Sequence, residues 1–187
     1  ELKQNAIVGT SSYRREFQVK KIRSDVSCKL IRGNVDTRIK KMENGDYDAI
    51  ILSKAGIESL KINHKISEEF KVEDFIPCAG QGIIAMQCRS NDFEIKELLE
   101  KINNPHSRIC ANAEREVLKI LEGDCDTAIG ILSKIEVDNI TLVAELFSVD
   151  GKNRYFIKKT KEINSAKELG REVGEDLKLK SKGNYKR

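Results

Sequence analysis

Three short apolar runs, residues 6–8, 28–31 and 49–52, occur in the first part of this chain, and each is followed by a turn and a helix-like segment. Strands that alternate with helices predict a parallel sheet with right-handed crossovers. The run 49–52 is apolar throughout, as expected for a strand covered on both faces. The helical patterns cover residues 12–22, 34–43 and from 55 to 60.

Two of these turns, residues 9–15 and 32–38, are rich in arginine and follow neighbouring strands. Helix N-termini favour anions, and open parallel sheets bind ligands beyond the carboxyl ends of their strands. The arginine fork suits carboxylates, although phosphate or a solvated basic helix face would also explain the pattern. The turns predict a site for a small molecule with several carboxylates or phosphates. The candidate residues are Thr10, Ser12, Arg14, Arg15, Arg32, Gly33 and Arg38.

The second half has a different order of elements. A turn-rich link over 77–82 leads into an apolar run, 83–88, that predicts a strand, and a domain boundary is expected near residue 104. A helix over 107–121 with Ser107 as N-cap precedes three strands and a last helix, which predicts an α+β domain with an antiparallel sheet. The strands are expected at 127–136, 141–148 and 154–159, the hairpin turns at 138–139 and 150–151, the helix at 164–178 and a frayed tail at 178–187.

Composition restricts the class of protein. The 187 residues are 39% hydrophobic and 34% charged, and no apolar run approaches the ~20 residues needed to span a bilayer. This favours a soluble globular protein that does not bind membranes. The net charge of +4 is small and few aromatic residues interleave with basic ones, so we expect no nucleic-acid partner. Because the sequence begins with Glu1 shortly before a strand, we expect it to be part of a longer or trimmed protein.

The five cysteines are odd in number and form no CxxC pair. We therefore expect reduced thiols in a cytoplasmic protein, with neither a disulfide framework nor a metal site. Cys125 lies in a loop between a helix end and a strand, where a thiol is accessible. From the residues alone, an unreactive loop cysteine is the simplest interpretation. His64 and His106 stand alone and are expected at the surface.

Five motifs in order resemble the porphobilinogen deaminase, or hydroxymethylbilane synthase, family over residues 6 to about 151. They are Val8–Arg15, Ile31–Arg38, Gly45–Leu52, Ala79–Gly82 and Leu121–Cys125. The resemblance implies a cytoplasmic three-domain transferase of porphyrin and heme biosynthesis. Such an enzyme condenses four porphobilinogen units into a linear hydroxymethylbilane, a tetrapyrrole, on a dipyrromethane cofactor. That cofactor is attached through a thioether to a loop cysteine, and Cys125 stands at its position.

The resemblance also gives the arginines a ligand. It implies that Arg14, Arg15, Arg32 and Arg38, with Thr10, Ser12 and Gly33, bind the carboxylates of the cofactor, of porphobilinogen and of the growing chain. The catalytic aspartate of the family lies in an N-terminal domain that is missing here. No residue of this chain is therefore expected to be catalytic, and the chain alone is expected to be inactive. The full-length form is expected to be a monomer, whereas the truncated chain could self-associate.

The implied fold is α/β. Residues 1–76 would form a parallel, doubly wound domain like those of periplasmic binding proteins, residues 77–103 a crossover toward the missing domain, and residues 104–187 a smaller α+β domain that carries Cys125. The chain departs from the family pattern at Asp124, where glycine is usual, at Gln87, where glutamate is frequent, and near 58–59, where an arginine is common. The alternative function is a non-catalytic module that binds polycarboxylates or other anions, and a nucleic-acid surface over 14–41 ranks last.

Overall fold

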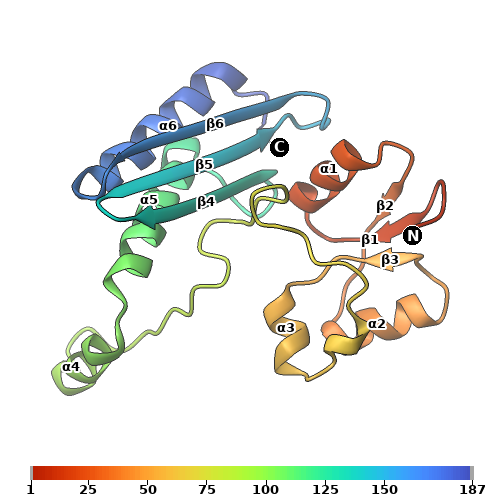
Figure 1. The fold of residues 1–187 in the computed structure, drawn as a ribbon, viewed down its shortest axis with the longest axis horizontal. Coiled ribbons are helices and arrows are strands. Elements are labelled where there is room, and N and C mark those ends of the chain that lie inside the picture. Colours follow the sequence, from red (N-terminus) through yellow and green to blue (C-terminus); the bar gives the residue numbers. More distant parts are fainter. Residues whose placement is uncertain (1, 186–187) are drawn as a thin grey trace.

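The computed structural model describes residues 2–185, which form an N-terminal unit, a C-terminal unit and a linking segment between them (Figure 1). In the N-terminal unit a parallel sheet has the strand order β2-β1-β3, and Val8 pairs with both Cys28 and Ala49. Its elements are β1 Ile7–Gly9, α1 Tyr13–Ile22, β2 Ser27–Lys29, α2 Val35–Glu43, β3 Ala49–Ile50, α3 Lys54–Ser59 and the 3-10 turn η1 Asn63–Lys65.

Helix α1 lies on one side of this sheet, and α2 and α3 lie on the other (Figure 1). The strand order explains this, because the chain moves from β1 to β2 in one direction and then past β1 to β3 in the other. Right-handed crossovers place the two connecting helices on opposite faces. The predicted parallel, doubly wound sheet is confirmed, whereas the likeness to periplasmic binding proteins stays a prediction. The third strand is shorter than predicted, and both of its residues are only half-buried.

The C-terminal unit is an antiparallel sheet of order β4-β5-β6 packed against two helices, as predicted. Its elements are α5 Pro105–Leu121, β4 Ile129–Glu136, β5 Asn139–Phe147, β6 Arg154–Glu162, the 3-10 turn η2 Ile163–Ser165 and α6 Ala166–Ser181. Alternate strand residues, among them Ile131, Leu142 and Ile157, point into one core with Val117 and Val173 of the helices.

The two helices approach closely where α6 has glycine. A Cβ placed on Gly170 would lie 2.3 Å from the carbonyl oxygen of Ala113, and one on Gly174 would lie 2.7 Å from Ile120 Cβ. A side chain at either position would force α5 and α6 apart. These glycines therefore set the packing of the helix that leads to the loop with Cys125.

Several predicted boundaries in this unit are wrong. The first hairpin turn lies at 137–138 rather than 138–139, because Asn139 already pairs with Glu136. Helix α5 begins at Pro105, and Asn104 is its N-cap rather than Ser107, because the Asn104 Oδ1 accepts the Ser107 N–H at 2.9 Å and proline is favoured in the first turn. The tail does not fray over 178–185. Helix α6 continues to Ser181, and the buried Tyr185 donates its hydroxyl to the Leu121 carbonyl at 3.1 Å. Residues 186–187 of the predicted tail lie outside the described residues.

The linking segment differs most from the prediction. Residues 83–88 form no strand, because no strand of the described chain lies beside them to bond their backbone. An unpredicted helix, α4 Phe93–Ile102, follows and stands apart from both units (Figure 1). Ile84 is 86% exposed and Phe93 76% exposed. Within residues 2–185, no helix is both long and apolar enough to cross a bilayer.

Helix α1 also makes a contact between the two units. Phe17 packs against Phe147 of β5, with ring centroids 5.7 Å apart, and against Ala128. Lys21 pairs at 2.8 Å with Glu145, whose side chain is fully buried. The helix that carries Arg14 and Arg15 is therefore held against the unit that carries Cys125.

Candidate anion-binding site

The turn after β1 presents hydroxyl groups at the start of α1. Ser12 is the N-cap, and its Oγ accepts the Arg15 N–H at 3.4 Å. The buried Thr10 accepts the Ser12 N–H at 3.2 Å through Oγ1 and bonds β2 through its own N–H. Each hydroxyl keeps its own proton as a possible donor. The local sequence thus places donors and the positive end of the helix dipole at the carboxyl end of β1.

The turn after β2 depends on glycine. Gly33 has a φ of +123°, and a Cβ there would lie 2.8 Å from Thr37 Cγ2, so a side chain would be both strained and crowded. Asn34 caps α2 by accepting the Thr37 N–H at 2.9 Å. Arg38 turns back to donate Nε to the Gly33 carbonyl at 2.7 Å, and Arg32 is exposed. This turn therefore carries one tethered and one exposed guanidinium.

The guanidinium groups of Arg14 and Arg15 bond to backbone carbonyl oxygens and are at least partly buried. Arg14, 5% exposed, donates Nη1 to the Ile76 carbonyl at 2.7 Å and Nη2 to Gln81 Oε1 at 3.3 Å. Arg15 donates Nη1 to the Ile51 carbonyl, just after β3, at 2.9 Å. The pKa of Arg14 is lowered to about 10, mainly by burial and in addition by the charge of Arg15. Burial also lowers the pKa of Arg15, as does the charge of Arg38. Arg14 therefore stays charged at neutral pH, and Arg15 experiences unfavourable charge interactions with both Arg14 and Arg38.

An anion would relieve this repulsion. Within residues 2–185, none of the four predicted site arginines forms a salt bridge, whereas Arg23 and Arg154 do. Carbonyl oxygens offset only part of the cost of burying a guanidinium. The positive charge at the carboxyl ends of the strands is therefore suited to an acidic ligand.

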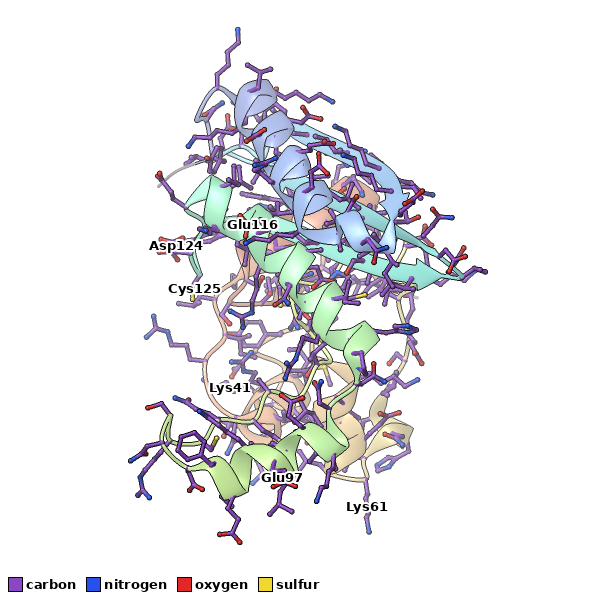
Figure 2. The ribbon with its side chains drawn as sticks, turned by 90° about the vertical axis from the view of Figure 1, so that its left-hand side faces the viewer. Lys41, Lys61, Glu97, Glu116, Asp124 and Cys125 are labelled. Carbon is purple, nitrogen blue, oxygen red and sulfur yellow. The ribbon has the colours of Figure 1, made fainter. Side chains whose placement is uncertain are left out.

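Cys125 lies in an exposed turn that Asp124 organises. The Asp124 Oδ1 accepts the N–H groups of Asp126 at 3.0 Å and Thr127 at 3.1 Å, and the Thr127 hydroxyl at 3.1 Å. The N–H of Asp126, more than any other group, lowers the pKa of Asp124, and the Thr127 hydroxyl adds to the effect. The Asp124 carboxylate is thus engaged by its own turn, and Cys125 is exposed. Figure 2 labels both residues at the edge of the C-terminal unit nearest the N-terminal unit.

The cysteine turn lies near the start of α1. Ala128 packs in one cluster with Phe17 and the partly buried Tyr13, which directly precedes Arg14. Cys125 is three residues before Ala128, so their Cα atoms are at most about 11 Å apart. The structure thus brings Thr10, Ser12, Arg14, Arg15 and Arg38 to one edge of the sheet. That these residues bind one ligand, together with Arg32, Gly33 and Cys125, stays a prediction.

Sequence reasoning missed two residues beside Arg14. Gln81 accepts from Arg14, and the exposed Cys78 donates its thiol to the same oxygen, Gln81 Oε1, at 3.3 Å. The glycines on either side of Gln81 indicate a tight turn in the sequence, and in the structure both have positive φ. His64 and His106 are exposed, as predicted.

Two family models match the chain. The model described as "Porphobilinogen deaminase, dipyromethane cofactor binding domain" matches residues 1–97, and the model described as "Porphobilinogen deaminase, C-terminal domain" matches residues 108–179. The chain belongs to the porphobilinogen deaminase family. This membership confirms the resemblance of the five motifs, and the first model places the arginine turns in a cofactor-binding domain.

Curated porphobilinogen deaminases are also similar in sequence to this chain. A probable porphobilinogen deaminase of Nitrosopumilus maritimus is 42% identical over 179 residues, 96% of this chain and 57% of its own length. The porphobilinogen deaminase of Coxiella burnetii (strain CbuG_Q212) is 41% identical over 92% of this chain and 56% of its own length. That of Syntrophobacter fumaroxidans is 35% identical over 91% of this chain and 55% of its own length. The chain spans little more than half the length of these relatives.

Proposed function

We propose that this chain is the cofactor-carrying part of a porphobilinogen deaminase, a transferase of tetrapyrrole biosynthesis that joins four porphobilinogen units into hydroxymethylbilane. Family membership supports the reaction class. One structural observation carries the proposal for this chain: guanidiniums without a salt-bridge partner gather on one unit, and an exposed thiol lies on the adjoining unit.

The residues fit a dipyrromethane cofactor. The thiol of Cys125 is exposed, so its sulfur can form a thioether, and the Asp124 carboxylate is engaged by its own turn. The acetate and propionate groups of a dipyrromethane match the charge of Arg14, Arg15 and Arg38. When bound, the cofactor supplies the covalent anchor to which new pyrrole units are added.

The contribution of this chain is binding and orientation. Arg15 and Arg38 hold substrate carboxylates at the sheet edge, the N-terminus of α1 adds its dipole through Ser12, and the exposed Arg32 extends the positive surface. Fixed charges of this kind lower a barrier by orienting the reactants and by stabilising charge. We assign no proton-transfer role to a residue of this chain, in keeping with the expectation that the catalytic aspartate lies in another domain.

The linking segment supports the proposed domain division of 1–76, 77–103 and 104–187. Its apolar side chains, including Ile84 and Phe93, are exposed, although the cofactor-domain model extends to residue 97. We propose that residues 83–102 pack against the part of the relatives' length that this chain does not span. The chain alone would then lack activity and could self-associate, and the complete protein would be a cytoplasmic monomer.

Mass spectrometry tests the cofactor assignment. The chain is produced in a host that makes tetrapyrroles, and its denatured mass is compared with the mass of the sequence. We expect an increase of one dipyrromethane that Cys125→Ser removes. Cys78→Ser is the matched control, because Cys78 is the other exposed cysteine, and this variant should leave the increase unchanged.

An adduct that survives Cys125→Ser, or one that only Cys78→Ser removes, would contradict the assignment. A wild-type chain that binds tricarboxylates reversibly and carries no adduct would instead support the alternative of a non-catalytic anion-binding module.

A further inference from the structure

Glu114 is a buried carboxylate of α5 that lies between the C-terminal unit and the linking segment. One oxygen, Oε1, accepts both the N–H and the hydroxyl of Ser133 in β4, each at 2.8 Å. The other, Oε2, accepts the N–H of Gly80 at 2.7 Å. Glu114 is 4% exposed, and its two oxygens together accept three hydrogen bonds. It therefore fixes Gly80 against the edge of the antiparallel sheet.

The same stretch of chain, residues 76–82, is held from the other side by α1. The Ile76 carbonyl accepts from Arg14 at 2.7 Å and from Gln18 at 3.0 Å, and Gln81 accepts from Arg14 at 3.3 Å. Gly80 and Gly82, with φ values of +71° and +87°, form the turn that carries Gln81. Glu114 and Arg14 thus hold one turn from opposite sides without contacting each other.

We propose that Glu114 is a positioning residue for the anion-binding site: it fixes the turn 80–82, and Gln81 of that turn fixes the guanidinium of Arg14. The inference rests on the proposed function for the role of Arg14 in binding carboxylates. Ile76 and Gln81 occupy two of the five N–H groups of Arg14 and fix the orientation of the guanidinium, so they decide which N–H groups face a ligand carboxylate. The position of the turn therefore sets how much of Arg14 is available to the ligand.

The test is Glu114→Gln in the full chain. Glutamine keeps the shape and can still accept from Ser133, but its NH₂ group then faces the Gly80 N–H, donor against donor. We expect hydrogen exchange of the Gly80 amide to accelerate about tenfold or more. We also expect the ¹⁵N guanidinium signals of Arg14 to shift and their Cζ–Nη rotation to accelerate. The affinity for propane-1,2,3-tricarboxylate should change by about threefold or more.

Matched variants separate positioning from general stability. Glu116→Gln makes the same chemical change on α5, at a residue that Figure 2 labels and that faces α6 near Gly170, and should leave Arg14 unchanged. Val173→Ala weakens the same core from α6 and removes no hydrogen bond of the turn. In a Gln81→Ala background, Glu114→Gln should no longer affect the Arg14 signals, since the coupling passes through Gln81.

The inference fails if Gly80 exchange accelerates in Glu114→Gln while the Arg14 signals stay as in the wild type, or if Val173→Ala moves them equally. Should Glu114→Gln not fold, Ser133→Ala keeps the carboxylate and removes one donor. It should give a smaller effect in the same direction, and unchanged Arg14 signals in this variant would overturn the inference. Gly80 exchange and the Arg14 signals are measured without a ligand. They therefore test this inference even if the wild-type chain carries no cofactor.

Discussion

Replacing Gly170 by alanine measures how tightly α5 and α6 must pack for the unit that carries Cys125 to fold. The new Cβ would lie 2.3 Å from the Ala113 carbonyl oxygen and 3.0 Å from Glu116 Cβ, whereas ordinary contact begins near 3.4 Å. The helices must therefore separate by about 1 Å, because a backbone oxygen cannot rotate away.

Overpacking of this kind costs about 1–3 kcal/mol, and a backbone clash belongs at the upper end of that range. Alanine regains about 1 kcal/mol over glycine in a helix interior. We expect Gly170→Ala to lower the free energy of unfolding by about 2 kcal/mol.

Urea unfolding of the full chain, followed by circular dichroism, gives this free energy. Gly56→Ala is the matched control, since Gly56 is also helical and its nearest neighbours to a new Cβ are side-chain atoms at 3.3 and 3.4 Å. That variant should equal the wild type or exceed it slightly. A Gly170→Ala protein as stable as the wild type would refute the packing argument.

Three further predictions concern the site and the linking segment. Arg38→Gln should weaken binding of propane-1,2,3-tricarboxylate about fivefold to tenfold in calorimetry through loss of a charged donor, whereas Arg108→Gln, which removes a guanidinium paired with Glu100, should not. The folded-state pKa of Asp124 is lowered, so its stabilising effect is present above its ordinary pKa of about 4 and is lost as the pH falls below that value. The protection of the Thr127 amide against hydrogen exchange should therefore decrease at these acidic pH values. Protection that does not change with pH would contradict this. Amides of residues 83–92 should exchange faster than those of residues 49–50, and equal protection in a monomer would count against an unpartnered segment.

The elements that the sequence predicted are those whose pattern is local. Strands β1 and β3 lie in apolar runs bounded by turns, and β4 and β5 are mostly buried strands joined by a short turn. The run 83–88 has the same composition but no neighbouring strand, and a strand needs one to satisfy its backbone. Asn104 replaced Ser107 as the helix cap because the proline that follows it fixes the first helical turn.

The candidate site, like the fold, could be predicted from the sequence only in its local features. The arginine turns are local features, and the structure brings Arg14, Arg15 and Arg38 to one edge of the sheet as the strand order requires. The partners of Arg14 could not be predicted, since Gln81 lies 67 residues further along the chain. The role of Glu114 could not be predicted either, because its contact with Gly80 joins a helix to a turn in another part of the sequence.

The charges of Arg14 and Arg15 link the site to the arrangement of the two units. Both guanidiniums are largely removed from water and bonded to carbonyl oxygens, yet a pKa near 10 leaves Arg14 charged at neutral pH. The field of Glu145 favours this charge, but that carboxylate is already paired with Lys21 and Arg154. An acidic ligand that is bound at these arginines and anchored at Cys125 would bridge α1 and the C-terminal unit. We therefore expect such a ligand to stabilise the contact between the units as well as the site.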